Sequence, residues 1–164
     1  MYEIKTILCA IAMTDNDNRI LGKAFREAKA HSADMHILHV LPAVSDIMIN
    51  PVVIMMGKEK FDKLIGEHLT EIESTIREEI EELKENVLTG DMADAKDRIA
   101  DIHVLQGDPV IEILDATKRL DADMLVMGTH AKGITEHTFM GDVAHKVLKR
   151  ARVPVLLVPA VKKH

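Results

Sequence analysis

Cysteine and long apolar runs are scarce in this sequence, and basic residues are outnumbered by acidic ones; each of these features argues against a class of protein. Cys9 is the single cysteine among 164 residues, so no disulfide can form within the chain and a reducing compartment is expected. No apolar run approaches the ~18 residues of a membrane-spanning helix, and the first residues lack the basic-then-apolar pattern of a secretion signal. We therefore expect a cytoplasmic protein without a membrane segment.

The charge is one-sided, with 27 Asp and Glu residues against 21 Lys and Arg residues. Much of the acidic excess lies between Lys58 and Glu85, where ten acidic residues accompany five basic ones. Nucleic acid binding depends on Lys and Arg that neutralise phosphates, so this balance argues against DNA or RNA as a partner. We interpret the excess as the solvated face of one long helix.

Apolar segments of strand character alternate with segments of helical periodicity along the chain. The expected strands are Ile4–Ala12, Met35–Leu41, Ile99–Leu105, Met124–Met127 and Val153–Val158. The expected helices run from about Ile20 to His31, from Lys58 to about Asn86, from Val110 to Leu120 and from Val143 to Ala151, with a polar connection at Gly90–Lys96. This alternation predicts one α/β domain over residues 1–160, a parallel sheet with helices on both faces.

The segment from Ala43 to Gly57 interrupts this pattern. It is rich in Val, Ile and Met but follows neither the strand nor the helix period around Pro51. We interpret it as an apolar loop insertion that packs over the sheet edge of its own domain. The alternative is a contact surface for an unidentified protein partner, because methionines adapt to surfaces of variable shape.

The stretch from Gly128 to Asp142 carries the clearest functional pattern. Gly128 follows an apolar strand, and Gly141 immediately precedes a basic amphipathic helix. A strand that leads through a loop into a helix directs several unpaired backbone N–H groups to one place, where an anion is stabilised. In a parallel sheet such a site lies beyond the carboxyl ends of the strands, so residues 12–14 and 41–42 should line the same crevice.

Several of these blocks together resemble the universal stress protein family. The specific blocks are Asp123-Met-Leu-Val-Met-Gly-Thr-His130 with its following glycines, and Val153-Pro-Val-Leu-Leu-Val158. Lys5–Ala12, Ile37–Val40 and Gly107–Pro109 are also similar to the family, and nearly the whole chain outside residues 43–57 is covered. The resemblance implies a doubly wound, five-stranded, Rossmann-like sheet of the adenine nucleotide alpha hydrolase type. It also implies a homodimer paired along the last strand, Val153–Val158.

In that family two residues separate the first and second glycines, nine separate the second and third, and a Ser or Thr follows; the motif wraps ATP. Here these positions fall on Gly128, Ala131, Gly141 and Asp142. The resemblance therefore implies a cofactor-binding set that also includes the neighbouring positions Ala12, Val40, Met127, His130, Lys132 and Val143.

Three positions depart from the family pattern. Ala12 replaces an Asp that contacts the nucleoside, Ala131 replaces a glycine, and Asp142 replaces the hydroxyl residue. A carboxylate at the start of a helix is itself an anion, and at ~4 Å and an effective dielectric of ~20 it repels a phosphate by about 4 kcal/mol. Asp142 could therefore occupy the phosphate position itself, or a Mg²⁺ ion could bridge it to the phosphates of ATP.

Chemistry beyond binding has little support in the sequence. The histidines His130, His137 and His145 have no Cys or carboxylate beside them at zinc-like spacing, so we expect no metal site. No residue is placed to orient a nucleophile or a base. We expect a regulatory protein that acts by binding; the alternatives are a slow ATPase and an interaction module that uses residues 43–57 without a nucleotide.

Overall fold

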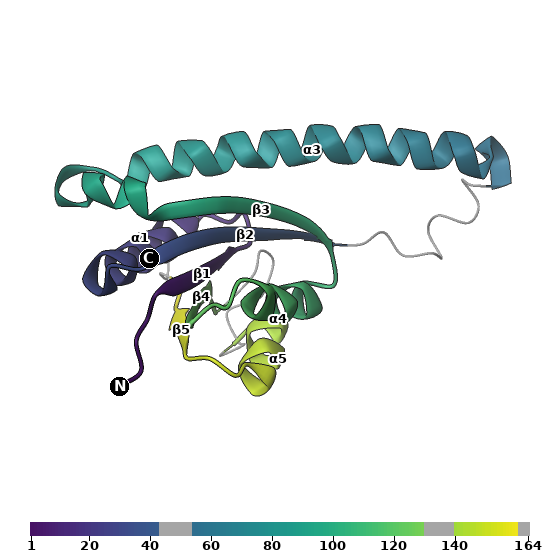
Figure 1. Cartoon of the computed structure of the whole chain (residues 1–164). Helices are drawn as coiled ribbons and strands as arrows, with labels where there is room; N and C mark the ends of the chain where they lie inside the picture. The colour runs from purple at the N-terminus through teal and green to yellow at the C-terminus, as the bar shows by residue number, and fades with distance from the viewer. Residues whose placement is uncertain (43–53, 130–139, 161–164) are drawn as a thin grey trace.

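A five-stranded parallel sheet forms the centre of the protein (Figure 1). The structure, a computed structural model, describes residues 1–42, 54–129 and 140–160. The strands are β1 (Thr6–Ile11), β2 (Asp34–Pro42), β3 (Ile99–Gly107), β4 (Met124–Gly128) and β5 (Val155–Val158). Their spatial order is β3-β2-β1-β4-β5, and every neighbouring pair is parallel. The order reverses at β1, so the predicted doubly wound sheet is confirmed.

Helices cover both faces of the sheet. On one face lie α1 (Asp17–His31), α3 (Lys58–Val87) and the 3₁₀ helix η1 (Gly90–Arg98). The other face carries α4 (Pro109–Arg119) and α5 (Asp142–Arg150), on the opposite side of the sheet from α3 in Figure 1. This arrangement leaves the carboxyl ends of the central strands accessible between the two helix layers.

The central strand β1 explains why two cores form. Ile7, Cys9 and Ile11 point toward α1, while Leu8 and Ala10 point toward α4 and α5. All five are buried because the strand is covered on both faces, which is why its sequence is a continuous apolar run. Cys9 has no exposed surface, and its thiol is free.

Local sequence signals set most element boundaries. Asp108 caps α4, with its Oδ1 atom accepting a hydrogen bond from the Ile111 N–H at 3.0 Å, and Pro109 occupies the first helical turn. Two expectations need correction. Gly90–Arg98 is a 3₁₀ helix rather than a plain polar connection, because Met92 and Ala95 are buried against the α1 side of the core. The last strand begins at Val155 rather than Val153.

The predicted apolar insertion lies only partly within the described residues. Positions 54–56 form a helical turn before α3, and Ile54 and Met55 are 84% and 89% exposed. Residues 43–53 fall outside the described ranges, so their packing against the sheet edge stays a prediction. In the described part of the chain, no helix is both long and apolar enough to cross a membrane.

Candidate functional site

A cavity of about 270 Å³ opens where the carboxyl ends of β1, β2 and β4 meet the N-terminus of α5. Its walls are mostly apolar, and His39, Thr129 and Asp142 are the residues with polar side chains in the lining. The other lining residues are Ala10, Ile11, Ala12, Ile20, Leu38, Val40, Pro109, Ile113, Met127, Gly128, Gly141, Val143 and Ala144. An apolar cavity with a few polar groups at one end suits a flat, largely apolar ligand part joined to a charged part.

The first turn of α5 supplies hydrogen-bond donors to this cavity. His145 donates the first helical bond, to the Gly141 carbonyl at 3.0 Å, so the N–H groups of Asp142, Val143 and Ala144 precede the helical ladder. All three residues line the cavity. The Gly141 N–H is engaged elsewhere, because it donates to the Thr129 carbonyl. An anion at this helix end would therefore be bound by residues 142–144 rather than by Gly141 itself.

The Asp142 carboxylate does not behave as the sequence suggested. Its Oδ2 atom lies 3.0 Å from the Lys146 ammonium one turn further along α5, and its side chain is 74% exposed. Within the described residues, the carboxylate is thus paired with a cation and is accessible to water instead of filling the phosphate position. The repulsion of about 4 kcal/mol between Asp142 and a phosphate applies to a fixed carboxylate with no cation beside it. It is an upper limit here, because solvent and Lys146 screen the charge of Asp142.

A second carboxylate, Asp17, organises the loop at the end of β1. Asp17 has no exposed surface, and its Oδ2 atom accepts the Thr14 N–H at 3.0 Å while the Asp17 N–H donates to the Thr14 carbonyl at 3.1 Å. Among the described residues, its buried Oδ1 atom has no hydrogen-bond partner. Burial raises the pKa of Asp17, although backbone N–H groups of residues 12–14 and the nearby His39 act in the opposite direction.

The two bonds between Thr14 and Asp17 fix a strained loop beside the cavity. Met13 has a φ of 56°, a left-handed conformation that a non-glycine residue adopts at a cost of about 1 kcal/mol or more. Ala12, the residue before it, lines the cavity. The expectations from the sequence include residues 12–14 in the crevice but not Asp17. The spacing Thr14-x-x-Asp17 matches the capping box and was the signal that could have singled out Asp17.

His39 also lies in the cavity wall, where it is 9% exposed. Its Nδ1 atom is 2.9 Å from the Ile11 carbonyl oxygen, and a carbonyl can only accept, so Nδ1 carries the proton. His39 is thus a hydrogen-bonded histidine at the edge of the core. Its bond links the ends of β1 and β2, which both border the cavity.

The structure brings most of the sequence-predicted site residues to one place. The cavity lining includes Ala12, Val40, Met127, Gly128, Gly141, Asp142 and Val143. These seven come from four separate segments of the chain that the parallel sheet aligns at one edge. The other three predicted residues, His130, Ala131 and Lys132, lie outside the described residues. In the portion that the structure describes, no group of three His, Cys, Asp or Glu side chains is placed to hold a metal ion.

The fold and the cavity define a class of α/β protein with a ligand-sized site at the switch point of a doubly wound sheet. The sequence profile of the universal stress protein family matches residues 3–159. A universal stress protein of Thermus aquaticus is 32% identical over 154 residues, which is 94% of this chain and 98% of the relative. The chain therefore belongs to the universal stress protein family.

Two further proteins are similar to this chain. Universal stress protein MJ0577 of Methanocaldococcus jannaschii is 27% identical over 136 residues, covering 83% of this chain and 82% of the relative. Its solved structure superimposes with a TM-score of 0.70 at 22% identity, over 99% of each chain. A universal stress protein solved in complex with cAMP has a TM-score of 0.61 at 18% identity, over 97% of this chain and 99% of the other. These structural likenesses show the shared fold.

Proposed function

We propose that this universal stress protein is a regulatory protein that acts by binding an adenine nucleotide in the cavity between β1, β2, β4 and α5. The N–H groups of Asp142, Val143 and Ala144 at the cavity wall are the observation that carries the proposal, because they supply an anion site beside apolar walls. The cAMP complex of a relative with the same fold supports an adenine nucleotide as the ligand class.

Within this proposal the apolar walls hold the base and the α5 end holds phosphate. Met127, Val40 and Ala12 border the apolar part, and Gly128, Gly141, Asp142 and Val143 border the anion end. His130, Ala131 and Lys132 belong to the connecting loop and are proposed as further contacts from the sequence alone. Mg²⁺ is proposed as a bridge between Asp142 and the phosphates of ATP, since carboxylate and phosphate oxygens are its usual ligands.

Calorimetric titration with ATP and with cAMP, each with and without Mg²⁺, tests the proposal. Asp142→Ser removes one anion from the cavity, so it should strengthen ATP binding without Mg²⁺ and weaken the effect of Mg²⁺. Asp115→Ser makes the same charge change at an exposed position of α4 outside the cavity and should leave both values unchanged.

A steric variant gives an independent test of the cavity. Ala12 is exposed and lines the cavity, so Ala12→Trp should fill it without disturbing a buried position. We expect loss of nucleotide binding with an unchanged thermal unfolding midpoint. If neither ATP nor cAMP binds the unmodified chain at millimolar concentration, the nucleotide proposal is wrong. Phosphate release above a no-protein control, lost in Gly141→Val, would instead favour the slow ATPase.

We also propose that the protein is a homodimer paired through β5. This strand is at the edge of the sheet, and three of its four residues, Val155, Leu156 and Leu157, are only partly buried. The Pro154 and Val158 carbonyls accept from β4, so the alternation of the ladder points the Val155 and Leu157 N–H groups outward. Val155→Pro should remove an outward donor, keep the bonds to β4 and abolish pairing through β5, so the mass measured by light scattering should fall below that of the unmodified protein.

The interaction module is the second candidate function. Ile54 and Met55, at the described end of the apolar segment, are 84% and 89% exposed, which is unusual for large apolar side chains. In this candidate function, residues 43–57 form a docking surface for a protein partner, and no nucleotide is required. Deletion of Val52–Met56 should then abolish capture of a protein partner and leave nucleotide titrations unchanged; unaffected capture would contradict it.

A further inference from the structure

Helix α3 is anchored to the domain through only part of its length. A helix of 30 residues spans about 45 Å, and its N-terminal part extends past the ends of β2 and β3 (Figure 1). Ile76 and Ile80 are buried against the α1 side of the core, whereas no described side chain from Lys58 to Thr75 is buried. We call residues 58–75 the α3 arm.

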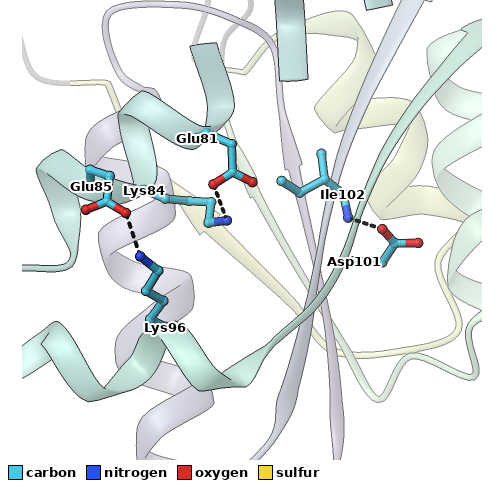
Figure 2. A network of polar contacts seen from close by, with 6 residues as sticks. All are labelled: Glu81, Lys84, Glu85, Lys96, Asp101 and Ile102. Carbon is cyan, nitrogen blue, oxygen red and sulfur yellow. Dashed lines mark hydrogen bonds and ion pairs between the residues drawn. The ribbon is translucent and has the colours of Figure 1, made fainter. Parts of the chain in front are cut away.

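Polar contacts show the same asymmetry. The Lys84 side chain is 8% exposed and its ammonium lies 2.7 Å from the Glu81 carboxylate, while Glu85 on α3 pairs with Lys96 on η1 at 2.7 Å (Figure 2). Arg77 donates to the Ile102 carbonyl on β3 at 2.7 Å. In the described portion of α3, every ion pair and every side-chain bond to another element involves residue 73 or later. The arm is therefore a projecting amphipathic helix.

The arm keeps an apolar stripe beyond the point where α3 meets the core. Phe61 and Leu64 are three residues apart, and Leu64 is 52% exposed. Ile72, eight residues or two steps of four further along, is partly buried and packs against the core, so the stripe of the arm continues the core-facing side of the helix. A helical segment of this length gains little stability from local propensity in water, so an apolar stripe on it is typical of a helix that packs against a partner. The identity of that partner follows from the charges beside the stripe.

Lys60, Glu67 and Glu71 lie on one flank of the stripe, because separations of seven and eleven residues are close to whole numbers of helical turns. All three side chains are exposed. The flank is thus basic toward the N-terminus and acidic toward the C-terminus. A second α3 arm running in the opposite direction brings Lys60 of each copy next to Glu67 and Glu71 of the other, whereas a parallel copy brings like charges together.

We propose that the α3 arm is a self-association surface that takes the α3 arm of a second copy of this chain in antiparallel orientation. The two-fold axis then crosses the arm near Gly66, midway between Lys60 and Glu71. Phe61 and Leu64 of each copy are covered, and two sets of opposite charges meet symmetrically, as a two-fold interface requires. This interface is separate from β5, so a chain that uses both surfaces forms assemblies larger than a dimer.

Charge reversal and its compensation give the sharpest test. Lys60→Glu places like charges on both sides of the two-fold axis and should raise the dissociation constant of the arm interface by about tenfold. The double variant Lys60→Glu/Glu71→Lys restores opposite charges with inverted polarity and should recover the original value. Sedimentation velocity over a concentration series measures both. Equal weakening in the single and double variants would overturn the antiparallel arrangement.

The apolar part is tested in a Val155→Pro background, where β5 pairing is removed and any remaining dimer must use another surface. Leu64→Glu should convert that dimer to a monomer, while Ile111→Glu, the same kind of change at a 48% exposed position on α4, should not. Helical content by circular dichroism should be unchanged in both. If Leu64→Glu leaves the mass of the dimer unchanged, or if the Val155→Pro protein is already a monomer, self-association through the arm is refuted. Neither outcome bears on nucleotide binding.

Discussion

Asp17 offers a prediction in which stability depends on pH with a defined sign. The carboxyl is fully buried, one of its oxygens has no hydrogen-bond partner in the part of the chain that the structure describes, and burial raises its pKa above the ordinary value of 3.8. The native state therefore binds a proton more tightly at Asp17 than the unfolded chain does. The contribution of Asp17 to the free energy of unfolding should be most favourable below pH 3.8. This contribution should be lost as pH rises through the raised native pKa.

The magnitude follows from linkage. Between pH 3.8 and the native pKa of Asp17, the free energy of unfolding should fall by up to about 1.4 kcal/mol per pH unit because of this one group. Asp17→Asn removes the titration but keeps an oxygen that can accept the Thr14 N–H. The stability of the unmodified protein minus that of the variant should therefore decrease with rising pH, and level off above the native pKa.

Urea unfolding of both proteins at a series of pH values from 4 to 8 measures this difference without assuming the behaviour of other groups. Asp17→Ala serves as a second comparison: it also leaves the partly buried Thr14 N–H without the Asp17 acceptor, so it should be less stable than Asp17→Asn by about 1 kcal/mol. A difference between Asp17 and Asp17→Asn that stays constant over the whole range would refute the reasoning, since it would mean that the pKa of Asp17 is not raised.

Three other substitutions test packing, backbone geometry and the histidine pair. Phe25→Ala removes a fully buried ring from α1 and should cost about 3–5 kcal/mol in urea unfolding; a loss near zero would contradict the core assignment. Gly107→Ala places a Cβ 2.8 Å from the Glu112 carboxylate at a φ of 155°, so it should cost about 1–3 kcal/mol and be partly relieved by adding Glu112→Ala. His36 Nδ1 lies 3.0 Å from His103 Nε2, and burial lowers the pKa of His103, so stability should decline as pH falls from 6.5 through its native pKa. His103→Gln should reduce that decline in unfolding experiments, and an unchanged decline would exclude His103 as its source.

The sequence was informative where the pattern is local. Period and capping chemistry located every strand of the sheet and the four main helices, because burial on both faces leaves continuous apolar runs and Asp108-Pro109 starts a helix by its own hydrogen bonding. It failed at Gly90–Arg98, where the composition is polar and the buried Met92 and Ala95 stabilise a 3₁₀ helix through contacts with distant residues. Local helix propensity does not depend on contacts with distant residues, so it could not predict this helix.

The candidate site shows the same division. The strand, glycine and helix order predicted an anion site near Gly141, but hydrogen bonding assigns the Gly141 N–H to Thr129 and leaves the donors at residues 142–144. Asp142 looked like a fixed charge in the site, yet Lys146 lies one turn away and pairs with it. Side-chain direction and bond partners depend on three-dimensional placement, so residue spacing could not decide them.

By itself, the sequence determined the class of fold, the order of its elements, the family, and the segments that meet at the carboxyl edge of the sheet. These depend on periodicity and on motif spacing, which are properties of the chain. Only the tertiary structure decided that Asp17 is a buried carboxyl beside the cavity, that Asp142 is paired and exposed, and that half of α3 projects beyond its own core. Burial and pairing are relations between distant residues, and they exist only once the chain has folded.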